Sequence, residues 1–494
     1  MSAADLSGLL AFNRFGLGVR LGSPPLAGDP RQTLLGELAT PGGARLDDAA
    51  LPASRDILQT VYADQLRRKM ERDQADAAQQ ATHGMPAPSV AALLQPEAMG
   101  APGMTASPAM AGMAAGAAPM TPAEPPAQTL FRADATARLR QACAAPIGYL
   151  ERLTAFWSNH FCVSVAKSEI GRAAAGAFER EAIRPYVLGR FADMLAAVER
   201  HPVMLNFLDN AQSVGPDSKA GQNRKAGLNE NLAREILELH TMGVGSGYTQ
   251  TDVTRFADIL TGWTIVGREG KLGEPGAFVF NVNAHEPGSA TLLGRVYSQD
   301  DVGQGEAALA DLARQPATAS HIARKFARHF VADAPDPAFV QRLAEVFHDS
   351  DGDLGALARA LIVDPAAWSA PPTKMRNPWE LTVASYRAFG LSPDDPRPAL
   401  GALNLLGMPL WQPSGPNGFS DDSADWASPE GMKTRLELAT RFAHQIKVAP
   451  RPPELLEQIL GPAASRATRE AVARAESQEQ AYALLLLSPE FQRR

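Results

Sequence analysis

The run of residues 228–244, LNENLAREILELHTMGV, concentrates side chains that could carry chemistry. Glutamate and histidine can ligate a metal ion or transfer a proton, so Glu235, Glu238 and His240 are candidates for either task. Successive residues of an α-helix are about 100° apart, which prevents these three side chains from sharing one side of a helix. Any metal or hydrolytic site would therefore need further ligands from other parts of the chain.

Two histidines outside this run are the candidates for those further ligands. His160 lies near the end of a predicted helix, and His285 lies in a predicted hairpin turn beside Glu286. Together with Glu235 they form the candidate metal-ligating and catalytic set of a metal-dependent hydrolase. Ligation of one ion requires the three side chains to converge within about 5 Å. The sequence identifies neither the metal nor any other cofactor.

A structural role for the same helix is the favoured interpretation. Asn229 is suited to cap the helix, and Glu230 and Arg234 have the spacing of an ion pair along one helix face. Asn231 and Glu235 would then fix the helix against neighbouring loops through buried hydrogen bonds. On this interpretation, Glu235→Ala leaves the hydrogen-bond partners of Glu235 unpaired and costs about 1–3 kcal/mol of stability.

Residues 413–426 form a second segment of interest, a polar and glycine-rich stretch that contains Phe419 and Trp426. Such a stretch is typical of a loop, and loops on rigid scaffolds often line binding surfaces. An ordinary packing loop is the open alternative. The candidate binding residues of the chain are polar residues of the 228–244 run and two tryptophans: Asn229, Glu230, Asn231, Arg234, Glu238, Trp263 and Trp426.

Two other groups of potential metal ligands give weaker signals. His321 and His329 lie eight residues apart, about 12 Å along a helix, so they cannot bind one ion, and we expect each at a surface or interface. Six methionines lie between residues 73 and 128, and thioethers are ligands of copper(I). Their irregular spacing favours a low-complexity linker instead.

The elements that position these residues are predicted to be mainly α-helical. Apolar residues recur at helical spacing in five segments, at 179–198, 317–331, 337–347, 354–362 and 435–447. Thr249 and Asp252 have the spacing of a capping box at the start of another helix. Between residues 277 and 296, two short alternating segments flank a Pro-Gly turn signal, which predicts a β-hairpin. We expect a large multi-helical body with one hairpin.

The chain divides by composition into three parts. Residues 73–128 are rich in Ala, Met, Pro, Gly and Gln and contain scarcely any aromatic residue, so they cannot build a core. We expect this part to be a disordered, low-complexity insert. Residues 1–72 and 129–494 would then be the N-terminal helical part and the main helical domain.

Composition excludes several classes of protein. Lysine and arginine total 47 against 54 for aspartate and glutamate, and the basic residues are dispersed, which argues against a nucleic-acid-binding protein. Cys143 and Cys162 match no zinc or redox spacing. Neither a signal peptide nor a membrane span is evident in the sequence. We expect a cytoplasmic protein, with export beside a partner left open.

The 228–244 run resembles the signature of a bacterial family, domain of unknown function 1800. Other blocks of the same signature follow in order, at 13–18, 156–161, 204–210, 247–250, 260–263, 315–319, 374–378, 413–426 and 487–494. The resemblance leaves out mainly the Met-rich insert. It implies bacterial origin and a gene that often neighbours a second family, domain of unknown function 1501, which resembles alkaline phosphatases and sulfatases. It implies no established reaction.

Two functions from different classes follow from these observations. The first is a helical binding or accessory scaffold that works with a partner of the DUF1501 family. It rests on the gene neighbourhood that the resemblance implies and on the lack of a self-sufficient catalytic motif. The second is the metal-dependent hydrolase that would use Glu235 with His160 or His285.

Overall fold

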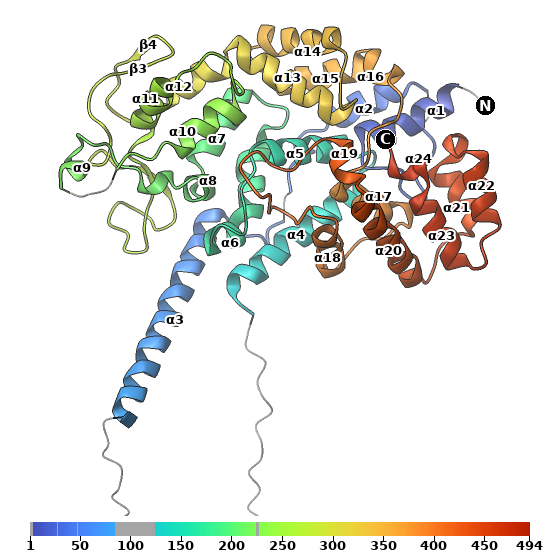
Figure 1. The fold of residues 1–494 in the computed structure, drawn as a ribbon, viewed down its shortest axis with the longest axis horizontal. Helices are drawn as coiled ribbons and strands as arrows, with labels where there is room; N and C mark the ends of the chain where they lie inside the picture. The colour runs from blue at the N-terminus through green and yellow to red at the C-terminus, as the bar shows by residue number, and fades with distance from the viewer. Residues whose placement is uncertain (1–2, 27, 47, 84–123, 224–226) are drawn as a thin grey trace, which may run out of the picture.

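A helical body contains most of the described chain. The computed structural model describes residues 3–26, 28–46, 48–83, 124–223 and 227–494 (Figure 1). Within these ranges the chain forms twenty-four α-helices and two short antiparallel strand pairs. The mainly α fold class predicted from the apolar periodicity is confirmed.

The helices fall on either side of the strands in the sequence. Before the strands lie α1 (Ala3–Leu10), α2 (Pro30–Leu38), α3 (Ser54–His83), α4 (Pro126–Ala144), α5 (Tyr149–His160), α6 (Glu169–Phe178), α7 (Phe191–Arg200), α8 (Pro202–Phe207), α9 (Lys219–Asn223), α10 (Asn231–Glu235) and α11 (Gln250–Leu260). After them lie α12 (Val302–Ala313), α13 (Pro316–Phe330), α14 (Pro337–Asp349), α15 (Leu354–Val363), α16 (Ala366–Ser369), α17 (Pro378–Ala388), α18 (Arg397–Leu405), α19 (Ser423–Trp426), α20 (Pro429–Gln445), α21 (Pro452–Ile459), α22 (Arg466–Ala473), α23 (Gln478–Leu487) and α24 (Pro489–Gln492). Short π or 3-10 segments adjoin them: η1 (Ala11–Phe15), η2 (Glu179–Ile183), η3 (Arg184–Tyr186), η4 (Asn210–Gln212), η5 (Ile236–His240) and η6 (Gly461–Ala463).

Most of the predicted helices are observed close to their predicted ends. Those predicted from residues 317, 337 and 354 are α13, α14 and α15. The helix predicted at 435–447 is α20, which begins earlier because Ser428 caps it and Pro429 fits its first turn. The capping box of Thr249 and Asp252 is present at the start of α11.

The single helix predicted at 179–198 is wrong. The chain instead forms the π segment η2 and the 3-10 turn η3, and α7 begins only at Phe191. Pro185 has no N–H to donate, so the helical hydrogen bonds are interrupted at that residue. The apolar periodicity continues across the break because both parts face the same core.

The hairpin predicted within residues 277–296 is wrong in its pairing. Strand β2 (Phe278–Phe280) pairs with β1 (Trp263–Ile265), which precedes it, and β3 (Ala290–Leu292) pairs with β4 (Arg295–Tyr297). Leu293 and Gly294 both have positive φ, at 50° and 77°. Such a two-residue turn matches the twist of a tight hairpin, so β3 pairs with the strand that directly follows it.

Helix α3 extends into the residues predicted to begin the insert. It continues to His83, and its outer part projects from the body (Figure 1). Every residue from Lys69 to Gln79 is exposed, as expected for a segment of polar composition. Helix α4 begins at Pro126, and residues 84–123 of the predicted insert lie outside the described residues.

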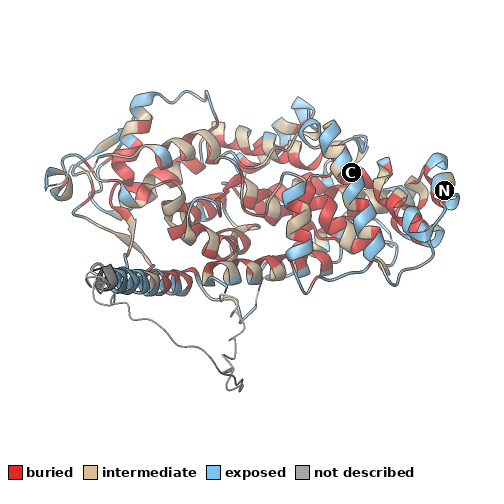
Figure 2. Ribbon diagram, turned by 60° about the horizontal axis from the view of Figure 1, so that its bottom comes forward, coloured by how far each residue is buried: buried red, intermediate tan, exposed pale blue. Residues whose placement is uncertain are grey.

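Helix α5 lies at the centre of the body (Figure 1). Ten of its twelve residues are buried, including the charged Glu151 and Arg152. Figure 2 shows the buried residues of the body on the sides of the helices that face one another. Because α5 has almost no exposed face, its polar side chains must find partners on other elements.

Buried ion pairs connect α5 to distant segments. Arg152 donates to one Glu380 oxygen over 2.6 Å, and Arg494 donates to the other over 2.7 Å. All three side chains are at most 3% exposed. Although burial raises the pKa of Glu380, the two guanidinium groups lower it to about 2. The carboxylate therefore ties α17 to α5 and to the end of the described chain.

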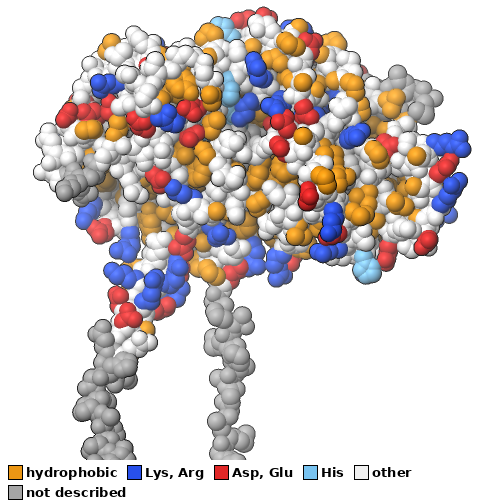
Figure 3. Space-filling model, viewed as in Figure 1, with side chains coloured by type: hydrophobic (Ala, Val, Ile, Leu, Met, Phe, Trp, Pro, Cys, Tyr) orange, Lys and Arg blue, Asp and Glu red, His pale blue; other side chains and the backbone are white. Residues whose placement is uncertain are grey.

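The described helices include none that is long and apolar enough to cross a membrane. On the face shown in Figure 3, basic and acidic side chains are intermixed over the body.

Candidate functional site

The helix that Asn229 is predicted to cap is divided by a π turn. Helix α10 covers Asn231–Glu235, and the next five residues form the π segment η5. The N–H and the hydroxyl of Thr241 both donate to the Ile236 carbonyl, over 2.9 and 2.6 Å. Gly243 then takes the left-handed conformation, with φ of 88°. π turns within helices are frequent at functional sites.

Two histidines from other elements hold the end of η5. Nε2 of His160, at the end of α5, donates to the carbonyl oxygen of His240 over 3.1 Å. Nε2 of His321, on α13, donates to the carbonyl oxygen of Leu239 over 3.1 Å. The last carbonyls of a helix have no partner within it, so the imidazoles satisfy these acceptors. A Cβ atom on Gly243 would lie 2.7 Å from Nδ1 of His321, which explains the glycine.

These two imidazoles are neutral at physiological pH. Burial lowers the pKa of His160 well below its usual range and that of His321 to about 4, and the charge of Lys325 lowers both further. Lys325 is half-buried on α13 and makes no hydrogen bond or ion pair with a described residue. A positive charge beside the free imidazole nitrogens disfavours a metal cation at this position.

A buried acid orients the ring of His240. Its Nδ1 lies 2.8 Å from Oε1 of Glu199, on α7, and both side chains are at most 1% exposed. The second oxygen of Glu199 is buried without a partner among the described residues. Because both side chains are buried, this pair supports η5 from within the core.

The polar face of α10 is partly used for structure. Glu230 accepts hydrogen bonds from Arg234 over 3.0 Å, Gln250 over 2.9 Å and Thr254 over 2.7 Å, which ties α10 to α11. Asn229 accepts the N–H of the residue that begins α10, over 2.9 Å. Asn229, Glu230 and Arg234 therefore have the structural role that the sequence predicted for this face.

Glu235 differs from the other polar residues of this helix. It is half-buried, and its carboxyl group makes no hydrogen bond or ion pair with any described residue. Burial raises the pKa of Glu235; the charge of Glu238 adds to this rise, whereas His240 and Arg234 reduce it. The buried hydrogen bonds expected for Glu235 are absent from the described contacts, so this carboxyl group is available to a ligand.

Glu235 borders an open hollow of about 780 Å³. Four segments supply its walls: Ser164, Ala166 and Lys167 after α5, Phe207 to Asp209 at the end of α8, Asn231 and Glu235 on α10, and Gly407, Pro409, Gln412 to Pro416 and Phe419 after α18. Asp209 is paired with Lys167 over 2.7 Å, which leaves Glu235 as the unpaired acidic group among the described residues of the hollow.

The loop wall of the hollow is held in place by residues at and just after the end of α5. Asn159, on α5, donates to the Phe419 carbonyl over 2.9 Å and accepts the Phe419 N–H over 2.8 Å. The thiol of Cys162 donates to the Pro416 carbonyl over 3.2 Å. Gly418 has φ of 76°, and a Cβ atom there would lie 2.5 Å from the Asn159 carbonyl oxygen. The loop therefore packs directly on the end of α5.

The same loop is joined to α13 beside the hollow. Asp421 accepts a hydrogen bond from Nδ1 of His329 over 2.7 Å, and its carbonyl accepts one from Lys374 over 2.7 Å. Burial lowers the pKa of His329, so a neutral imidazole donates to an ionised carboxylate. The expectation that His321 and His329 lie at a surface or interface is wrong, because they are half-buried and buried on the inner face of α13.

The candidate metal ligands lie in different clusters. His160 contacts η5, Glu235 borders the hollow, and His285 donates from Nδ1 to the Thr261 carbonyl over 2.9 Å. Nδ1 of His160 and Nε2 of His285 are buried without hydrogen-bond partners among the described residues. No three His, Cys, Asp or Glu side chains in the described ranges are grouped so that they could hold a metal ion.

The remaining candidate binding residues also lie apart. Trp263 is fully buried in the core beside Phe278. Trp426 is half-buried and donates to the Ser420 carbonyl over 3.0 Å, within its own loop. Glu238 accepts a hydrogen bond from Arg234 over 3.5 Å. Of the seven binding candidates, Asn231 is the one that borders the hollow.

A family model described as protein of unknown function (DUF1800) matches residues 11–493. The chain belongs to the DUF1800 family. No curated protein and no solved structure matched the chain. Three of the blocks that carry the DUF1800 resemblance, 204–210, 228–244 and 413–426, supply walls of the hollow. A fourth, 156–161, contains Asn159, which holds the loop wall.

Several residues around the candidate site of this DUF1800 protein were not identified from the sequence. Cys162 and Asn159 hold the loop wall, and Lys325 lies between the two histidines of α13. The spacing of His321, Lys325 and His329 at four-residue intervals was a usable signal, because it places all three on one helix face. The contacts of Asn159 with a loop about 260 residues away had no local signal.

Proposed function

We propose that this DUF1800 protein is a binding protein whose open hollow holds an extended, basic segment of a partner protein. The observation that carries the proposal is the unpaired carboxyl group of Glu235 within a wide hollow. A charged group placed in a concave site without an internal partner is typical of a group that orients a ligand. A lysine or arginine of the partner would pair with it.

The other walls supply the groups that bind a polypeptide. Ser414 and Asn231 are exposed, and Gln412 is half-buried, so hydroxyl and amide groups are available to main-chain N–H and carbonyl groups. Phe207 and Phe419 are half-buried and offer apolar contact area. A partly apolar surface that carries a few polar groups has the composition expected of a specific recognition site.

The loop wall is preorganised, which favours binding. Its backbone is fixed by Asn159 and Cys162 and anchored at Asp421 by His329. A loop that is already ordered loses little conformational entropy when a ligand binds, so more of the contact energy appears as affinity. The hollow is therefore expected to change little in shape on binding.

The partner to test first is the DUF1501 family protein that the family resemblance implies. The helical body would act as its accessory scaffold, in maturation or export of that protein. The experiment uses the full-length chain and a purified DUF1501 protein from the same organism, with affinity measured by isothermal titration calorimetry. Glu235→Arg should weaken binding by about tenfold or more, equivalent to about 1.4 kcal/mol.

Glu345→Arg on α14 is the matched control, because Glu345 is an exposed helix residue outside the hollow. It should leave the affinity unchanged. Equal affinity of the wild type and Glu235→Arg, or no complex at all, would contradict the proposal. Elemental analysis of the same chelator-free protein tests the hydrolase alternative, since stoichiometric bound metal would favour an enzyme instead.

A further inference from the structure

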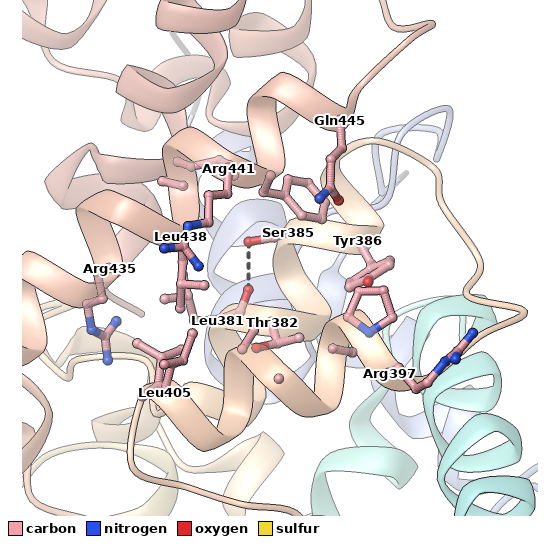
Figure 4. A pocket seen from close by; sticks show the side chains of 18 of the residues that line it. Leu381, Thr382, Ser385, Tyr386, Arg397, Leu405, Arg435, Leu438, Arg441 and Gln445 are labelled. Atoms are coloured by element: carbon pink, nitrogen blue, oxygen red, sulfur yellow. Dashed lines mark hydrogen bonds between the residues drawn. The ribbon is translucent and has the colours of Figure 1, made fainter. Parts of the chain in front are cut away.

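A second cavity of about 250 Å³ lies between α17, α18 and α20 (Figure 4). Its walls are mainly apolar and include Leu381, Ala402, Leu438, Phe442 and Leu486. It shares no lining residue with the hollow beside Glu235. A mainly apolar cavity with a few polar groups is the usual form of a small-molecule site.

The inner end of the cavity carries a buried positive charge. Arg435 is 2% exposed, and within the described part of the chain it donates only to uncharged groups, the Gln492 side chain over 2.7 Å and the Arg376 carbonyl over 2.8 Å. Its Nε is buried and has no hydrogen-bond partner in the residues that the structure describes. Glu380 interacts electrostatically with Arg435 at longer range, but its carboxylate is already paired with two other arginines. The cavity therefore favours an anion over a cation.

The rim of the cavity adds unused hydrogen-bond donors. Arg441 is exposed and makes no hydrogen bond or ion pair with a described residue. Figure 4 shows Arg441 and Gln445 on α20, with Leu405 below them on α18. Leu405 is 57% exposed, an unusual position for a large apolar side chain at the edge of an apolar cavity. Arg397, on the other side of the cavity, differs from Arg441 because it is paired with Asp395.

We propose that this cavity binds an unbranched aliphatic carboxylate. The alkyl chain would lie between Leu405 and Leu438, and the carboxylate would accept hydrogen bonds from Arg441 at the rim. A guanidinium group suits a carboxylate because it presents paired donors in one plane. A water molecule takes up about 30 Å³ of the liquid, so the cavity has room for roughly eight groups of that size. Octanoate is accordingly the first ligand to test.

The experiment compares octanoate, 1-octanol and butyrate as ligands of the full-length protein by isothermal titration calorimetry. Octanoate should bind at least about tenfold more tightly than either of the others, because octanol lacks the charge and butyrate lacks the chain. Equal binding of octanoate and octanol would overturn the proposal. So would the absence of octanoate binding at about 1 mM.

Variants at the rim test the position of the carboxylate. Arg441→Gln should weaken octanoate binding about fivefold and leave octanol binding unchanged. Lys433→Gln, an exposed cation of the same helix outside the cavity, is the matched control and should change neither. An Arg441→Gln variant that binds octanoate like the wild type would contradict the proposed head-group position and with it the proposal.

Variants of the walls test the position of the chain. Ala402→Phe fills the cavity and should abolish octanoate binding, whereas Asn404→Phe, on the exposed side of α18, should not. Leu405→Asp is a second test, and it does not depend on core packing because Leu405 is exposed. The negative charge of the new aspartate should weaken the binding of octanoate more than the binding of octanol. Octanoate binding that survives in folded Ala402→Phe and in Leu405→Asp would place the ligand elsewhere and overturn the proposal.

Discussion

Nδ1 of His329 lies 2.7 Å from Oδ1 of Asp421, and this contact joins helix α13 to the loop that forms one wall of the hollow. The side chains are 6% and 16% exposed, so the hydrogen bond is largely shielded from water. Although burial raises the pKa of Asp421, His329 and Lys374 hold it well below its usual range. The loop therefore depends on a charge that is held in the interior.

Asp421→Asn should destabilise the protein, because it weakens the attachment of the loop wall to α13. The substitution removes the charged acceptor of His329 and leaves buried donors poorly satisfied, at a cost of about 1–3 kcal/mol. Urea denaturation gives the stability change. Asp425→Asn, at an exposed position in α19, is the control and should stay within about 0.5 kcal/mol of the wild type. Equal effects of the two substitutions would show that the His329 contact contributes nothing.

Acid should destabilise the fold below about pH 6.5. Burial lowers the pKa of His160, His321 and His329 in the folded state, whereas in the unfolded chain each returns to about 6.5. The unfolded state therefore binds more protons as the pH falls. Each such histidine lowers the free energy of unfolding by about 1.4 kcal/mol per pH unit until its folded-state pKa is reached, about 4 for His321.

The measurement is the melting temperature of the wild type and of His321→Gln between pH 7 and pH 4. His321→Gln should lower stability at pH 7, because the hydrogen bond to Leu239 is lost, but should reduce the decline toward acid pH. The exposed His348, changed to Gln in the same way, should leave the pH dependence as it is. If the melting temperature of His321→Gln falls toward acid pH as steeply as that of the wild type, the lowered folded-state pKa assigned to His321 is contradicted.

Glu380→Gln should be among the most destabilising single substitutions in the core. It leaves Arg152 and Arg494 buried without the carboxylate that neutralises them, and breaking a buried pair in this way costs about 3–5 kcal/mol. Thermal unfolding provides the measurement. Glu437→Gln on α20 removes an exposed carboxylate 4.0 Å from Lys433 and should change stability by less than about 0.5 kcal/mol. A similar loss of stability in both variants would show that the buried cluster contributes no more stability than the exposed pair.

Glu235→Gln should leave stability within about 0.5 kcal/mol of the wild type. The sequence interpretation predicted the opposite for loss of this carboxylate, because it assigned buried hydrogen-bond partners to Glu235. The structure gives Glu235 no such partner among the described residues and places it at the hollow. A loss of more than about 1 kcal/mol in urea denaturation would restore the structural role and remove the basis for a free ligand-binding group.

Local patterns were sufficient for most of the helices. α13 and α14 begin with proline at the first turn and carry an apolar stripe of helical period, and both features are readable from adjacent residues. The break at Pro185 was missed because the apolar period continues across it. The pairing of β1 with β2 was missed because a strand as short as three residues is defined by its partner more than by its own sequence.

The site could be predicted only in part. The 228–244 run identified α10 and Glu235, and residues 413–426 were recognised as a loop that could line a binding surface. The roles of His160 and His321 were not predictable, because the carbonyls that they bind lie 80 and 82 residues away in the sequence. Histidine in a sequence signals metal or proton chemistry, whereas here geometry assigns these two side chains to the end of a helix.

The central claim is that the hollow beside Glu235 is the surface that binds the partner protein. Hydrogen–deuterium exchange of the full-length chain, with and without saturating DUF1501 protein, tests this claim most directly. Binding should slow exchange of the backbone amides in residues 231–238 and 412–419 and leave α14 unchanged. A complex that forms while both segments exchange as in the free protein would contradict the account.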